Sequence, residues 1–76
     1  MKYVISLFDK NTEKLLGEID VSHLSGTFLA SLFGIPLSEF VDSYPIGERE
    51  AAALSELSGV GFDLQGVDYF LDPYRA

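Results

Sequence analysis

The residues best suited to chemistry lie near the C-terminal end of the chain. Three aspartates, Asp63, Asp68 and Asp72, are interleaved there with the aromatic residues Phe70 and Tyr74. Carboxylates can bind a metal, form an acid–base pair or attract a cationic partner, and aromatic rings supply large apolar contact areas. The spacing of these acids, and the residues available to act with them, decide among these functions.

A metal site is not predicted. The three aspartates do not follow the alternate-position spacing of a calcium loop, and no ligand-dense run of about twelve residues occurs. His23 is the one histidine and the chain has no cysteine, so the usual nitrogen and sulfur ligands cannot complete a zinc site. We therefore expect no metal and no cofactor, with His23 solvated or locally hydrogen-bonded.

Catalysis is not predicted either. None of the serines lies in the Gly-x-Ser-x-Gly turn of a hydrolase nucleophile. A glycosidase-type carboxylate pair needs a sugar-binding cleft, for which a chain of 76 residues rarely has room. Gly59 and Gly61 are not followed by the lysine and helix start of a phosphate loop. We expect a protein that is not an enzyme. A minimal enzyme or a small-ligand carrier is an alternative, and it would need a deep apolar pocket holding a carboxylate of strongly raised pKa.

The net charge of −7 is distributed unevenly. Residues 1–36 hold four acids and three lysines, a net charge of −1, whereas residues 37–74 hold eight acids against Arg49 alone, a net charge of −7. Such a surface repels phosphate backbones and anionic membranes and attracts a basic protein. Direct binding to nucleic acid or membrane is therefore not expected. Solubility is the simpler explanation of the same acidity.

The first part of the chain predicts two strands joined by a hairpin loop. Lys2–Asp9 is apolar on both faces, which is typical of a central strand. Lys14–Val21 has one polar face, which suits an edge strand whose charges discourage pairing with other chains. The polar connection between them suits a hairpin loop, in which Asn11 is able to adopt the left-handed conformation.

The last strand is predicted from period-two alternation beginning at Val67. Gly66 is expected to form a bulge or turn before it, and Pro73 to end it by removing a ladder donor. Alternation places aromatic residues on both faces and acids on the outer one. One face is predicted to hold Val67, Tyr69 and Leu71, and the other Asp68, Phe70 and Asp72.

Two helices are predicted between the second and last strands. Ser25 is the preferred N-cap of the first, with Ser22 as the alternative, and Gly34 follows its apolar residues 28–33. Glu48–Ser58 forms the second, with acids in its first turn and three consecutive alanines. Its inward stripe is expected to contain Ala53, Leu54 and Leu57, with Ala51 or Val60 beside it.

This order, β-β-α-α-β, predicts a small α+β fold in a single domain spanning residues 1–76. We expect about three strands in the order 2-1-3, with two helices packed on one face. Segment 37–46 is not assigned, but its apolar side chains must pack on the domain or on a partner. No stretch is long enough for a membrane helix or a signal-peptide core, so a cytoplasmic location is expected.

Protein recognition is the function that the residues favour. Acids beside exposed aromatics fit a basic, partly apolar surface, because the rings anchor the contact and the carboxylates steer the encounter. The alternative is that Phe70 belongs to the core beneath a helix, with the aspartates at its rim. The predicted partner-binding residues are Asp63, Asp68, Phe70, Asp72 and Tyr74, with Glu39, Asp42 and Tyr44 as a second patch.

Several short segments also follow one another in an order that resembles a known class. They are residues 4–9, the turn at Leu24–Ser25 with a helix ending in residues 32–35, residues 43–46, and residues 68–71. This order is similar to that of small acidic bacterial immunity proteins encoded beside polymorphic or contact-dependent toxins. The resemblance implies a tight inhibitor that covers the toxin's active site, with nucleases among the targets. It assigns no binding residue in this chain.

A second class of function is a homo-oligomerising or adaptor module without inhibitory activity. In that case the last strand, or the segment Phe40–Ile46, pairs with its own copy and hides apolar surface. A symmetric dimer would bring like charges together, which opposes this arrangement. Both a monomer and a homodimer are compatible with the sequence.

Overall fold

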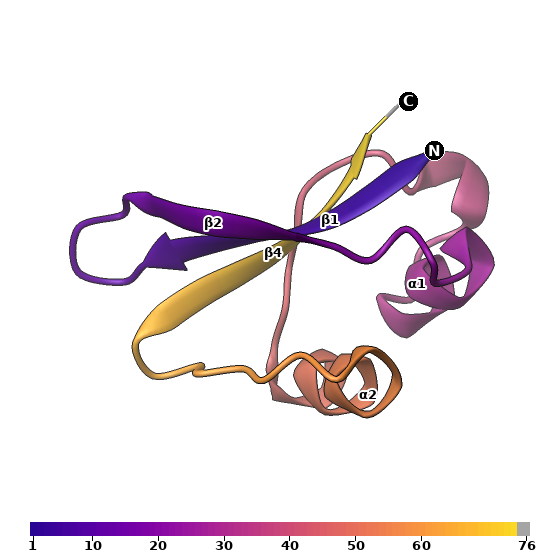
Figure 1. The fold of residues 1–76 in the computed structure, drawn as a ribbon. Helices are drawn as coiled ribbons and strands as arrows, with labels where there is room; N and C mark the ends of the chain where they lie inside the picture. The colour runs from indigo at the N-terminus through magenta and orange to yellow at the C-terminus, as the bar shows by residue number, and fades with distance from the viewer. Residues whose placement is uncertain (75–76) are drawn as a thin grey trace.

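The first strand, β1 (Lys2–Asp9), lies at the centre of the sheet, as its two apolar faces predict. In the computed structural model, which describes residues 1–74, it pairs antiparallel with β2 (Leu15–Asp20) on one side and with β4 (Val67–Tyr74) on the other. Figure 1 shows the three strands crossing in one twisted layer. The last strand therefore lies beside the first, as expected.

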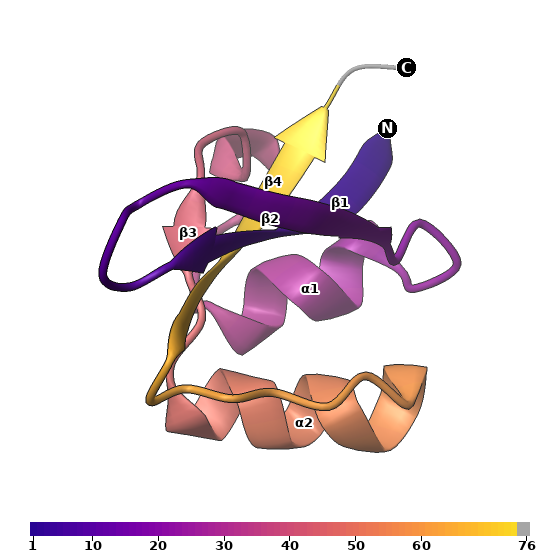
Figure 2. The ribbon, with the colours of Figure 1, turned by 60° about the vertical axis from the view of Figure 1, so that its left-hand side comes forward.

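The sheet has four strands, one more than the sequence predicts. A short fourth strand, β3 (Tyr44–Pro45), pairs antiparallel with β4, so the sheet order is β2-β1-β4-β3 rather than a three-stranded 2-1-3 (Figure 2). The ladder continues past Pro45, where the Ile46 amide donates to the Tyr69 carbonyl at 2.9 Å. Two residues, one of them proline, are too few for an alternating pattern, so β4 rather than the local sequence defines this strand.

Pro73 does not end β4, which continues to Tyr74. Tyr69 receives the Ile46 amide on its β3 side, so residues of the same parity direct their backbone groups toward β3. Pro73 has that parity but lies beyond the two residues of β3, opposite Tyr3 of β1. Its missing N–H therefore removes no hydrogen bond from the ladder with β1.

The loop between β1 and β2 also differs from expectation. Its left-handed residue is Glu13, with φ 60°, and not Asn11. The Asp9 carboxylate accepts hydrogen bonds from the amides of Asn11 and Thr12, at 2.8 and 3.0 Å. The Asp9 carbonyl accepts from the Glu13 amide at 2.7 Å. Asp9 thus holds the start of the loop, and the positive φ falls two residues later than predicted.

The first helix, α1 (Gly26–Leu32), begins as predicted. Ser25 is its N-cap, and its hydroxyl accepts from the Phe28 amide at 3.3 Å. The alternative cap, Ser22, instead accepts from the Tyr3 amide at 2.9 Å and ties the end of β2 to β1. Gly34 has φ 68°, which favours glycine after the helix. A short 3-10 turn, η1 (Leu37–Glu39), follows.

The second helix, α2, has the predicted bounds Glu48–Ser58. Gly47 precedes it, and the Glu50 carboxylate accepts from the Gly47 amide at 2.9 Å. The pKa of Glu50 is lowered: partial desolvation raises it, but this hydrogen bond and the neighbouring Arg49 together outweigh that effect. One part of the predicted stripe is wrong, because Leu57 is 55% exposed. Leu54 of the predicted stripe and Ala51 beside it are buried, and Ala53 is partly buried.

Both helices pack on the same face of the sheet, as Figures 1 and 2 show. The unassigned segment 37–46 contributes to this core, because Phe40 and Ile46 are buried and Tyr44 is partly buried against it. Within residues 1–74, neither helix has the length and apolar character needed to cross a bilayer. The largest fully buried side chains are Phe40, Ile5, Leu29, Leu54, Leu71 and Val21.

Candidate protein-binding face

Among residues 1–74, no helix lies on the opposite face of the sheet (Figure 2). Directly opposed residues of antiparallel strands point to the same side, so the register identifies the side chains on this face. Asp68, Phe70 and Asp72 of β4 lie opposite Phe8, Ser6 and Val4 of β1. We call the following residues the open face: Lys2, Val4, Ser6, Phe8, Glu18, Asp20, Asp68, Phe70, Asp72 and Tyr74.

An aromatic pair lies at one end of the open face. The rings of Phe8 and Phe70 meet edge to face with their centroids 5.7 Å apart, and both are only partly buried. Leu15 of β2, opposite Phe8, is largely exposed and extends this apolar area. Val4 and Ser6 are buried beneath the longer side chains around them. The open face therefore has an apolar floor that reaches solvent at Leu15 and, in part, at Phe8 and Phe70.

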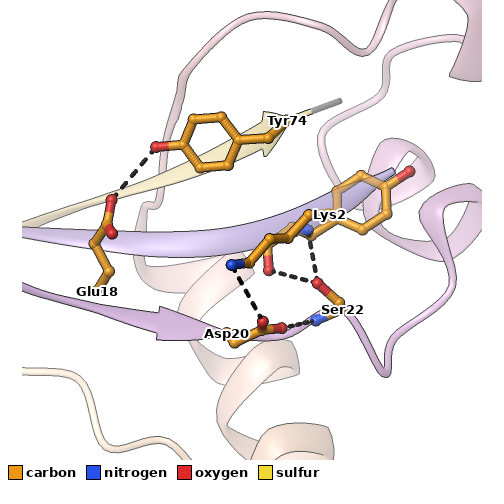
Figure 3. Close-up of polar contacts among 6 residues, drawn as sticks. Lys2, Glu18, Asp20, Ser22 and Tyr74 are labelled. Atoms are coloured by element: carbon orange, nitrogen blue, oxygen red, sulfur yellow. Dashed lines mark hydrogen bonds and ion pairs between the residues drawn. The ribbon is translucent and has the colours of Figure 1, made fainter. Parts of the chain in front are cut away.

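Carboxylates from two strands flank this floor. Figure 3 shows the Tyr74 hydroxyl donating to Glu18 at 3.3 Å across β1, and the Lys2 ammonium 3.9 Å from Asp20. The pKa of Tyr74 is raised, first by partial desolvation and then by the negative charges of Glu18 and Asp72. A tyrosine phenol is protonated at neutral pH even without this shift, so Tyr74 is a donor to Glu18 there.

The two aspartates of β4 have different roles. Asp72 accepts a hydrogen bond from the hydroxyl of Ser6, which is 3% exposed, so it satisfies a buried polar group. The Asp68 carboxylate is half exposed and lies 3.7 Å from the Lys10 ammonium. Exposed ion pairs of this kind contribute little to stability, so Asp68 is available to an external cation. The open face carries four carboxylates, and only two lysines, Lys2 and Lys10, lie close to them. The open face is therefore acidic.

The structure brings together four of the five residues of the predicted main patch. Asp68, Phe70, Asp72 and Tyr74 share the open face, and Phe70 is not covered by a helix. Asp63 is separate, because it stabilises the turn before β4. Its carboxylate accepts from the amides of Gln65 and Gly66, both at 3.3 Å, and its carbonyl from the Val67 amide.

The predicted second patch is a structural unit. The Tyr44 ring stacks on Phe40, with centroids 4.9 Å apart and planes 7° from parallel. The Tyr44 hydroxyl donates to the Glu39 carbonyl and accepts from the amides of Val41 and Asp42. Tyr44 thus holds the loop after η1 and is not a free anchor. The carboxylates of Glu39 and Asp42 are exposed beside it.

The sequence-based selection missed Phe8, Glu18 and Asp20. The period-two patterns of β1 and β2 already separated these side chains from the inward residues. Register between β1 and its two neighbours then places them on the same face as Asp68, Phe70 and Asp72. Knowing the sheet order was therefore necessary to find them.

Two hollows adjoin Asp68 and Phe70. One, of about 300 Å³, lies toward Pro45–Glu48 and Leu64. The other, of about 200 Å³, is lined by Phe8, Glu13, Asp68 and Phe70. Among residues 1–74, no three potential metal-ligating side chains of histidine, cysteine, aspartate or glutamate are gathered together. Small-molecule pockets usually have volumes of about 300–1,000 Å³, so the first hollow is at the lower limit of this range and the second is below it.

Comparison with protein families identifies the family of this chain. Residues 2–72 match the model of a family described as a domain of unknown function (DUF7683), and the chain belongs to that family. Searches of curated proteins and of solved structures gave no significant match.

The hydrogen bonds of Asp9 and Asp20 predict a pH dependence of stability. Amides of Thr12 and Asn11 lower the pKa of Asp9, and the Ser22 amide lowers that of Asp20. A carboxylate with a lowered pKa stabilises the folded state above its unfolded value, here about 3.8, and this contribution is lost as the pH falls through the folded value. We expect D9N and D20N to be less stable than wild type at neutral pH and to converge with it in acid.

Urea unfolding over a descending pH series measures this effect. D42N is the matched control, because the Asp42 side chain accepts no hydrogen bond within the described residues. A constant stability difference between D20N and wild type at every pH would contradict the assignment.

Proposed function

We propose that this protein is a protein-binding inhibitor whose open face covers a basic surface of its partner. The observation that carries this proposal is the combination of features on that face. A sheet face without a helix among residues 1–74 presents the partly exposed Phe8–Phe70 pair together with carboxylates contributed by β2 and β4.

Each component has a role in such a complex. Aromatic side chains near the centre of an interface supply most of its binding energy. Carboxylates around them speed the encounter with a basic surface and reject acidic ones. Phe8, Phe70 and Asp68 belong to the paired strands β1 and β4, so their backbone is already ordered before binding. A low cost of ordering favours affinity.

The proposed partner is a bacterial toxin domain, and the protein its cognate immunity protein. This step is supported by the resemblance of the segment order to small acidic immunity proteins. It also agrees with the charge, because a nuclease toxin binds phosphates through a basic groove that an acidic face can occupy in their place. We propose that inhibition occurs by covering that groove.

Self-association through the last strand is less well supported. β4 has β1 along one side and β3 along part of the other, so its backbone is largely paired within the chain. Phe40 and Ile46, the first and last residues of the segment Phe40–Ile46, are both buried in the protein's own core. A dimer formed by packing two open faces together would also bring their carboxylates close to one another, and these like charges would repel.

The test is a capture from the native host's lysate with the tagged protein as bait, followed by an activity assay on the captured protein. We expect one stoichiometric basic partner that is weakened but not removed by high salt. Its toxic or enzymatic activity should be abolished by one equivalent of this protein. Size measurement of the isolated protein should give a monomer.

Two results would overturn the proposal. One is recovery of only the bait itself at both salt concentrations, together with a dimeric size. The other is a stoichiometric partner that keeps full activity in the complex, which would make this protein an adaptor.

A further inference from the structure

We propose that the 200 Å³ hollow beside the aromatic pair binds a single arginine side chain of the partner. This inference deepens the proposed function by identifying the group that the open face recognises. It rests on that function only for the source of the arginine, because the hollow itself can be tested with a small probe.

The lining of the hollow contains two kinds of group. Phe8 and Phe70 supply aromatic surface, and Glu13 and Asp68 supply carboxylates. The planes of the two rings are 82° apart, so the rings are not stacked on each other and present differently oriented aromatic surfaces beside the hollow. The Glu13 carboxylate comes from the β1–β2 loop and the Asp68 carboxylate from β4, so the acids approach from separate elements.

This combination selects for a planar cation. A guanidinium group can lie against an aromatic face while its N–H groups donate to carboxylates at the edge. It is also less strongly hydrated than an ammonium, so transfer to an apolar floor costs less. The volume is below the roughly 300 Å³ at which small-molecule pockets begin, which suits one side chain rather than a cofactor.

The protein's own Lys10 already approaches this site. Its ammonium lies 3.7 Å from the Asp68 carboxylate and its side chain is 41% exposed, so it offers a weak internal substitute for an external cation. An arginine entering the hollow would compete with Lys10 for Asp68. Removing Lys10 should therefore strengthen binding of the probe, a gain that loss of folding cannot imitate.

The experiment is an NMR titration of the full chain with Nα-acetyl-arginine amide. Nα-acetyl-citrulline amide is the matched probe, because it keeps the shape of the side chain and removes the charge. We expect the ring signals of Phe8 and Phe70 to shift with the arginine probe, which should bind about tenfold more tightly than the citrulline probe. The lysine analogue should bind more weakly than arginine.

Two variants separate binding from stability. E13G removes one carboxylate, and glycine accepts the positive φ of residue 13 without steric cost, so the fold should be retained. We expect it to weaken the arginine probe roughly two- to fivefold, and K10Q to strengthen it by a similar factor. The denaturant midpoint of E13G should equal or exceed that of wild type.

Equal shifts with arginine and citrulline, or shifts confined to other residues, would overturn this inference. So would unchanged probe affinity in both E13G and K10Q. These failures would leave the proposed function standing if a captured partner still bound the open face. Conversely, probe binding without any captured partner would support the arginine site and count against the inhibitor.

Discussion

Replacement of Phe40 by alanine is expected to remove a large part of the stability of the fold. Phe40 is 1% exposed and contacts three aromatic rings, with centroids 4.9 Å from Tyr44, 6.0 Å from Tyr3 and 6.2 Å from Phe33. Deleting a buried phenylalanine costs about 3–5 kcal/mol. A protein of this length has a total of roughly 4–11 kcal/mol. Urea unfolding, with amide dispersion in NMR spectra, measures the loss.

The neighbouring residue provides the control for this prediction. Val41 is 62% exposed, so V41A should change the free energy of unfolding by no more than about 0.5 kcal/mol. Y44F keeps the ring that stacks on Phe40 and removes the hydroxyl that holds the loop, so it should cost about 1 kcal/mol. If F40A were no more destabilising than V41A, segment 37–46 would not pack as described.

The elements with a clear periodic signal could be predicted from the sequence. Both apolar faces of β1 indicated a central strand, and alternation from Val67 separated Tyr69 from Phe70 correctly. Ser25 could be identified as an N-cap because its hydroxyl acts within one turn. In each case the information is contained in the segment itself.

Features that depend on a distant segment could not be predicted. β3 exists only because β4 supplies its hydrogen-bond partners, and Pro73 is tolerated only because β3 stops short of it. Leu57 matched a helical stripe but is exposed, because the sheet and α1 bury the side of α2 that carries Ala51 and Leu54. Packing between elements decides these positions.

The candidate site was predicted in part for the same reason. Alternation along β4 gave Asp68, Phe70 and Asp72, but register was needed to add Phe8. Composition cannot separate an acid that binds a partner from one that holds a turn. Asp63 has the second role, since its carboxylate is occupied by amides of its own loop.

Charge reversal on the open face is expected to slow association with the captured partner. The variant combines D68K with E18K and keeps Asp72, which accepts from the buried Ser6 hydroxyl. Electrostatic steering raises association rates by factors of about 10–1,000, so the rate constant at low salt should fall by at least about tenfold. High salt screens exposed charges, so the difference from wild type should shrink there. Stopped-flow association kinetics measure both effects.

A matched variant shows whether position or total charge is responsible. D42K with E56K changes the net charge from −7 to −3, as D68K with E18K does, but alters the loop after η1 and the exposed side of α2. It should slow association less. F70A should act differently from both, because loss of an anchor accelerates dissociation more than it slows association. If the D42K/E56K pair had the larger effect, binding would involve the second patch and the open face would not be the interface.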